Sequence, residues 1–276
     1  DLHLQQFAPC SDPNGNKGIG MLLRRITKHI KDQNWFAVGL DFLIVVFGVF
    51  IGIQVSNWNE EQGRKSQERS HLVLLNEELT QNAERSALLL EYYTSVTGAG
   101  ERALDFLKSD EECKGNCEDL LIDFFHASQL WAVSFDQLAF REAIDLGFPS
   151  DNDLREELSA TYNLTSSFGL INQTSPPFRE KVREYFETDA ARILWGGCWE
   201  VDVAAVTERL MRDCADQLKT VDASGMLQSI KGDPDLEGML RYSLNQNIIA
   251  MLNYPVMRDR TIAMADMIAT EIETTR

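Results

Sequence analysis

The sequence predicts an all-α protein with one N-terminal transmembrane helix, which continues into a helical stalk and an extra-membrane helical bundle. Two observations predict this class. A run of twenty residues, from Phe36 to Val55, is almost entirely apolar. Beyond it, apolar side chains recur at three- and four-residue spacing, and no sustained two-residue alternation indicates a sheet.

The predicted transmembrane helix covers residues 35–58. Its apolar run measures about 30 Å at the helical rise of about 1.5 Å per residue, which matches the hydrocarbon thickness of a bilayer. Trp35 and Trp58 bracket the run where indole rings prefer the lipid headgroups. A buried core helix and a cleavable signal peptide are the alternatives. The length of the run argues against both, and no small-residue cleavage site follows Val55.

The residues before this helix fall into two expected segments. Residues 21–34 form a basic cytoplasmic segment, whose excess of Lys and Arg predicts that the N-terminus lies inside. Residues 1–20 lack any periodicity and are interpreted as a disordered or non-native leader, with Met21 as the hypothetical natural start. The expected interfacial anchors in the basic segment are Arg24, Arg25 and Lys28.

A narrow seam follows the span over residues 59–97 and predicts a helical stalk, either a coiled coil or one helix of a bundle. The seam consists of Leu72, Leu75, Leu79, Asn82, Ser86, Leu89 and Tyr93. Glutamates such as Glu78 are expected on the solvated faces of this helix. Gly98 and Gly100 are expected to end it.

Residues 98–276 are predicted to form an acidic helical domain. Its expected helices are 101–108, 118–146, 153–168, 178–194, 200–218 and 236–273. Pro255 is expected to kink or split the last of these.

Charge limits the partners of the exterior region. Residues 60–276 contain 39 Asp and Glu against 21 Lys and Arg, a net charge of −18. Nucleic acid is excluded as a partner because phosphate binding needs a basic surface.

Four cysteines lie in this region, and their even number favours an oxidising compartment, here the periplasm. A disulfide between Cys113 and Cys117 is our first expectation, with reduced, buried cysteines as the alternative. If 200–218 is one helix, Cys198 and Cys214 lie about 24 Å apart and cannot pair, since a disulfide needs Cα atoms within about 7 Å. A metal site is not expected, because the C-x3-C spacing lacks a second pair of ligands.

Polar and small residues mark the predicted span itself. Asp41 lies six residues into it, where an ionisable group indicates a function, either contact with a partner helix or hydration at the cytoplasmic interface. Gly48 and Gly52 have the GxxxG spacing, which lets two helices approach closely. The predicted helix–helix contact in the membrane therefore comprises Asp41, Gly48, Gly52 and Gln54.

No catalytic motif is found, and we predict neither enzyme activity nor a bound cofactor or metal. Three tryptophans, Trp131, Trp195 and Trp199, are candidates for lining a ligand pocket. Aromatic residues at helical spacing are also common in cores, and that alternative stays open.

The span and the helix after it resemble an uncharacterised family of bacterial single-pass membrane proteins with a domain of unknown function. Matching residues are Asp41, Gly48 and the stretch Gln54-Val55-Ser56-Asn57-Trp58-Asn59-Glu60. The later stretch FREAIDLGFPSDNDLREELSATYN, residues 140–163, is also similar to the family. Its acidic residue is usually Glu, so Asp41 departs slightly. The resemblance implies location in a bacterial inner membrane and no particular activity.

The leading functional hypothesis is a non-enzymatic interaction or scaffolding protein of the bacterial envelope. Its expected partners are the lipid bilayer and another membrane or envelope protein, or a second copy through the span. The alternative is a periplasmic ligand-sensing domain that signals through a partner membrane protein, because the expected cytoplasmic segment is too short for an output module. A periplasmic hydrolase is the third option.

Overall fold

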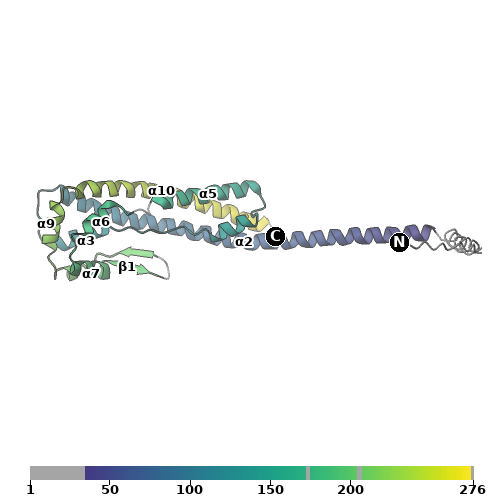
Figure 1. Cartoon of the computed structure of the whole chain (residues 1–276), viewed down its shortest axis with the longest axis horizontal. Helices are drawn as coiled ribbons and strands as arrows, with labels where there is room; N and C mark the ends of the chain where they lie inside the picture. The colour runs from purple at the N-terminus through teal and green to yellow at the C-terminus, as the bar shows by residue number, and fades with distance from the viewer. Residues whose placement is uncertain (1–34, 172–174, 204–206, 275–276) are drawn as a thin grey trace, which may run out of the picture. The chain divides into compact units, whose positions relative to one another are not determined.

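The computed structural model of the chain describes residues 35–171, 175–203 and 207–274. It confirms the predicted all-α class, since helices make up most of these residues (Figure 1). The chain divides into two compact units between Gly63 and Arg64, and helix α2 (Trp35–Lys108) supplies residues to both. The expected leader and the basic segment with Arg24, Arg25 and Lys28 lie outside the described residues.

The second unit follows α2 with short helices, one hairpin and a long last helix. First come α3 (Cys117–Ala127), α4 (Leu138–Asp145), α5 (Asn152–Ile171), α6 (Pro177–Arg183) and α7 (Thr188–Gly197). Strands β1 (Trp199–Asp202) and β2 (Thr207–Leu210) then pair antiparallel, with Trp199 opposite Leu210 and Asp202 opposite Thr207. The chain ends with α8 (Ala215–Leu218), α9 (Ala223–Gly232) and α10 (Leu236–Thr274).

The seam predicted on α2 is buried along its whole length. Its residues are Leu72, Leu75, Leu79, Asn82, Ser86, Leu89 and Tyr93, each at most 2% exposed. The same spacing continues to Ala103, which is fully buried. Side chains at three- and four-residue spacing share one helix face, so this face supports the core of the second unit.

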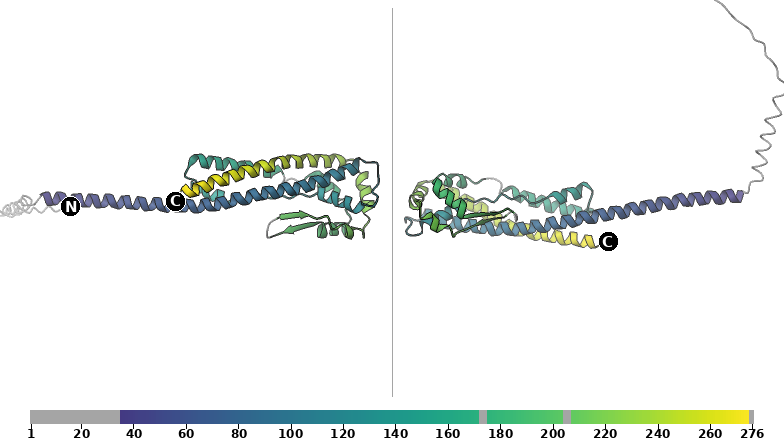
Figure 2. Two further views of the ribbon diagram at one scale, coloured as in Figure 1. Left: turned by 180° about the vertical axis from the view of Figure 1, so that it is seen from behind. Right: turned by 90° about the horizontal axis from the view of Figure 1, so that it is seen from below.

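Three hydrophobic clusters lie along that face. Near Leu75, α2 packs against α5 and α10, which run beside it in both views (Figures 1 and 2). Around Tyr93 it packs against α10 and the irregular segment after α3, which inserts Trp131. Near Ala103 it meets α3, α9 and the start of α10.

Gly100 does not end α2, contrary to the sequence-based expectation for Gly98 and Gly100. The helix continues to Lys108, so the separate helix expected over 101–108 is the C-terminal end of α2. A Cβ atom at Gly100 would lie 2.6 Å from Leu244 Cδ2 on α10. The glycine therefore serves the close approach of two helices.

Two further expected helices are each divided. The helix expected over 118–146 becomes α3 and α4, because α2 side chains bind the backbone between them: Asn82 donates to the Asp136 carbonyl at 2.8 Å and Arg85 to that of Ser134 at 3.0 Å. The helix expected over 178–194 becomes α6 and α7.

The helix expected over 200–218 is wrong. Strands β1 and β2 occupy most of this range, and the hairpin brings its two ends together. Cys198 and Cys214 consequently form a disulfide with a Cα separation of 5.3 Å, against the expectation that they cannot pair. The distance of about 24 Å applied only to a continuous helix.

Pro255 lies inside α10 and does not split it. Proline removes one backbone donor and disfavours a helix interior, so this position is costly in isolation. Here α10 is anchored on both sides of it, since Tyr254 and Met257 are at most 4% exposed. Tertiary packing thus overrides the local preference.

We predict that replacing both Cys198 and Cys214 by serine lowers the free energy of unfolding by about 3 kcal/mol, the value expected for closing a loop of this size. Chemical denaturation of the full chain in detergent measures the change. Peptide mapping without reduction should recover the Cys198–Cys214 crosslink. Recovery of Cys198 joined to Cys113 or Cys117 instead would refute the hairpin.

Candidate functional site

The apolar stretch of α2 carries the first group of candidate residues. Among the described helices, α2 alone is long and apolar enough to cross a membrane by length and composition. At about 100° per residue, Asp41 and Gly48 differ by about 20° around the helix, and Gly48 and Gly52 by about 40°. These three residues therefore share one face. A Cβ atom at Gly48 or Gly52 would meet nothing within 4 Å, so this face is open in the single chain.

Gln54 does not share that face, although the sequence-based prediction groups it with the other three. It lies about 160° around the helix from Gly52. Trp35 and Trp58 are 71% and 65% exposed at the two ends of the apolar run. Their positions fit the expected pair of interfacial anchors.

A buried carboxylate on α2 organises the start of α4. Glu78 is 6% exposed, which corrects its expected place on a solvated face. It accepts hydrogen bonds from the backbone N–H groups of Ala139 at 2.7 Å and Phe140 at 3.2 Å, and from the Tyr162 hydroxyl at 2.5 Å. The first N–H groups of a helix lack partners within it, and Glu78 supplies them from the side.

Glu68 has the same role nearer the start of the buried face of α2. It is 3% exposed and accepts hydrogen bonds from the backbone N–H and the hydroxyl of Ser150, at 2.5 and 2.7 Å. Ser150 belongs to the turn after α4, where Gly147 has a φ of 76° that favours glycine. The two stretches that carry the family resemblance, residues 36–84 and 140–163, thus meet through Glu68 and Glu78.

Burial of the Tyr162 ring raises the pKa of its hydroxyl, and the hydrogen bond to Glu78 raises it further. The hydroxyl therefore stays protonated and remains a donor to the carboxylate at any physiological pH. Phe140 stacks on the same ring, with centroids 4.1 Å apart. Glu68, Glu78 and Tyr162 form a polar clamp between α2 and the segment from α4 to α5.

A second buried carboxylate ties α3 to α2 and to the segment after β2. Asp123 accepts two hydrogen bonds from Arg102, at 2.7 and 3.0 Å, and also pairs with Arg212. Beside it, His126 donates from Nε2 to the Cys198 carbonyl at 2.9 Å. Burial lowers the pKa of His126 to about 4, so the ring is neutral near neutral pH. This network fixes the end of α7 where the hairpin begins.

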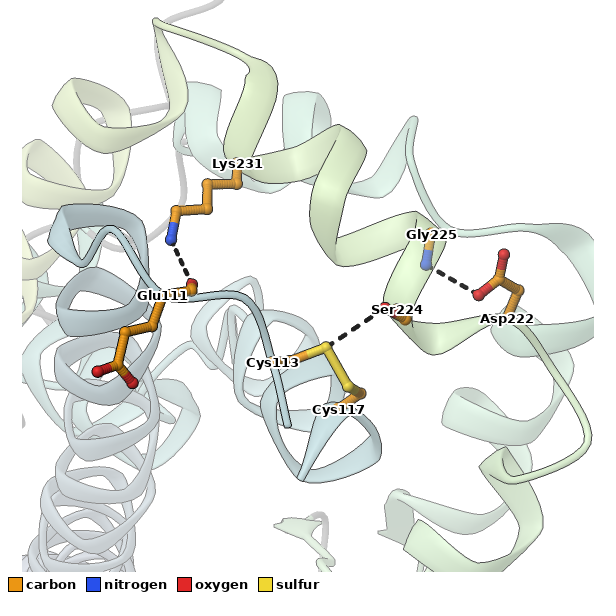
Figure 3. The surroundings of a disulfide bond; sticks show 7 residues. All are labelled: Glu111, Cys113, Cys117, Asp222, Ser224, Gly225 and Lys231. Carbon is orange, nitrogen blue, oxygen red and sulfur yellow. Dashed lines mark hydrogen bonds between the residues drawn. A yellow bond between two sulfur atoms is a disulfide. The ribbon is translucent and has the colours of Figure 1, made fainter. Parts of the chain in front are cut away.

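The Cys113–Cys117 disulfide favoured by the sequence is present between α2 and α3, with a Cα separation of 5.3 Å (Figure 3). The hydroxyl of Ser224 lies 3.6 Å from Cys113 Sγ, and Lys231 donates to the Glu111 carbonyl at 2.7 Å. Both partners belong to α9, so the disulfide loop is fixed against that helix.

The three candidate tryptophans do not line one pocket. Trp195 meets Trp199 and Phe125 edge to face, and the Arg183 guanidinium lies 4.9 Å from its ring centroid. Trp199 donates from Nε1 to Glu208 at 3.1 Å. Only Trp131 of the three is among the residues that line a cleft of 220 Å³ between α2 and β2.

Spacing could have identified some of the functional residues that sequence reasoning missed. Glu68 lies four residues before Leu72 and continues the seam, and Glu78 lies beside Leu79. An acidic residue in register with a buried seam is a signal for a buried, hydrogen-bonded carboxylate. The cleft had no such signal, because hairpin and helix are far apart in sequence.

Among the described residues, no group of three His, Cys, Asp or Glu side chains is placed to hold a metal ion. Comparison of the chain with protein-family models, with curated proteins and with solved structures found no match.

We predict that Glu78→Gln lowers the free energy of unfolding by about 1–3 kcal/mol, because the amide has one acceptor oxygen and turns an NH2 group toward donors. Denaturation of the full chain measures this. Glu77→Gln is the matched control on the exposed side of α2 and should change stability by less than about 0.5 kcal/mol. Equal effects of both substitutions would contradict the clamp.

Proposed function

We propose that this chain is a membrane-anchored, non-enzymatic interaction or scaffolding protein of the bacterial envelope. In this proposal α2 crosses the inner membrane once, the N-terminus is cytoplasmic and residues from 64 onward are periplasmic. The apolar run of α2 and the two disulfides support this arrangement, since disulfides persist in oxidising compartments.

The observation that carries the proposal is an apolar stripe on α10. Tyr242, Ile249 and Val256 recur every seven residues, with Ile248 and Leu252 beside them. All five are between 44% and 68% exposed. Contiguous exposed apolar side chains on a folded domain mark interaction sites.

The spacing of the stripe fits a helix of the partner protein. Large apolar residues at seven-residue intervals, with another between them, form the seam by which two helices pack. The inner face of α10 is already occupied by α2, as the contact of Gly100 with Leu244 illustrates. The outer face is therefore the one that an apolar partner helix would cover.

We predict that Leu252→Glu reduces crosslinking and co-purification of the membrane partner at least about tenfold, a loss of about 1.4 kcal/mol. The reason is that a carboxylate at the centre of the stripe loses its hydration on binding. Quantitative mass spectrometry of crosslinked membranes measures recovery. Leu138→Glu is the matched control, because Leu138 is 65% exposed and Leu252 68%. A chain that crosslinks to nothing, or equal losses for both variants, would refute the proposed interface.

A second copy is the proposed contact of the span itself. The shared face of Asp41, Gly48 and Gly52 would let two spans approach closely, and Asp41 would meet a polar group there. We predict that Gly48→Ile with Gly52→Ile weakens self-association of the full chain in lipid about tenfold. Gly39→Ile, on the opposite side of the helix, should leave it unchanged. Energy transfer between labelled chains measures the association, and insensitivity to the double change would remove the claim.

Ligand sensing through a partner is the second candidate function. The cleft lined by Trp131 is the observation that favours it. The polar clamp gives no comparable support, because its donors and acceptors are occupied by one another.

A further inference from the structure

We propose that the cleft between α2 and β2 binds a small organic cation, specifically a primary ammonium on a short aliphatic chain. This deepens the ligand-sensing candidate by naming the class of ligand. It does not depend on the partner proposed for α10.

The cleft has two walls of different origin. One face of α2 supplies Leu88, Glu91, Tyr92 and Ser95, which follow helical spacing, and the opposite wall is strand β2. Trp131 joins them from the segment after α3. The volume of 220 Å³ lies below the range of about 300–1,000 Å³ typical of drug-sized ligands, so the cleft suits a molecule of a few heavy atoms.

Negative charge dominates the interior of this cleft. Glu91 projects from α2 and Glu208 from β2, so carboxylates stand on both walls. The basic lining residue, Arg209, pairs with Glu200 at 2.6 Å on the neighbouring strand. Its charge is therefore compensated outside the cleft, and a cation is the ligand charge that the two carboxylates favour.

Glu208 is held in position by neutral donors. Its Oε2 atom accepts hydrogen bonds from the Tyr92 hydroxyl at 3.2 Å and from Trp199 Nε1 at 3.1 Å. Neutral donors orient a carboxylate without cancelling its charge. Burial, and secondarily Glu208, raises the pKa of Tyr92, so the hydroxyl remains a donor.

Arg179 is the other basic residue whose charge acts on Tyr92 and Glu208. Its guanidinium donates to the Ser128 carbonyl at 2.6 Å, and it does not line the cleft. The charge of Arg179 thus offsets some of the cost of burying Glu208 from behind and leaves the cleft side to a ligand.

The aromatic and apolar lining completes the match to an alkylammonium. Tyr92 and Trp131 meet edge to face, with centroids 5.2 Å apart. Aromatic faces attract cations, and more strongly where water is excluded. Leu88 and Leu210 offer apolar contact to a short alkyl chain.

The test is calorimetric titration of the full chain in detergent with three molecules of similar shape: butylammonium, butanol and butyrate. We expect butylammonium to bind at least tenfold more tightly than butanol, and butyrate to bind most weakly. Equal binding of the three, no binding of butylammonium, or preference for butyrate would overturn the proposal. None of these results bears on co-purification of a partner through α10.

Variants locate the site. Glu208→Gln keeps an acceptor for Tyr92 and Trp199 while removing the charge, and should weaken butylammonium binding at least tenfold. Glu91→Gln changes an exposed residue, leaves folding intact and should weaken binding several-fold. Glu77→Gln removes the same charge elsewhere on α2 and should stay within twofold of the unsubstituted chain. Loss of binding in Glu77→Gln equal to that in Glu91→Gln would overturn the site, because it would reveal a general charge effect.

Discussion

The second unit depends on the burial of a single face of α2, from Glu68 to Ala103. Each hydrophobic cluster of this unit includes residues of that face, so α3, α5 and α10 are placed by what they bury against it. The face is long and narrow, and different helices cover it at different points along its length. Cooperation between distant segments follows, since α10 returns along α2 and meets it at Gly100.

Burying polar groups in this face imposes a second constraint. A carboxylate taken out of water needs hydrogen bonds in return, and Glu68, Glu78 and Asp123 each receive at least two. The donors include segments with little helical structure of their own, such as the turn at Ser150. Irregular chain is thereby given a fixed position on a regular helix, and the same principle holds the carboxylate of Glu208 beside the cleft.

The sequence was sufficient for features that depend on local periodicity or length. The apolar run, the buried seam from Leu72 to Tyr93 and the all-α class all follow from spacing. Features that depend on distant contacts could not be read in this way. The hairpin after Cys198 had no strong alternation, the continuation of α2 through Gly100 depends on Leu244, and the division at Ser128 depends on side chains of α2. The cleft belongs to the same class, because its walls are more than a hundred residues apart.

The central claim, that one face of α2 supports the second unit, is tested most directly by amide hydrogen exchange on the full chain in lipid nanodiscs. The account predicts that amides of residues 72–103 exchange slowest in the second unit, slower than those of the hairpin at 199–210, because they open only with the whole unit. Exchange of residues 72–103 as fast as that of the hairpin would contradict it.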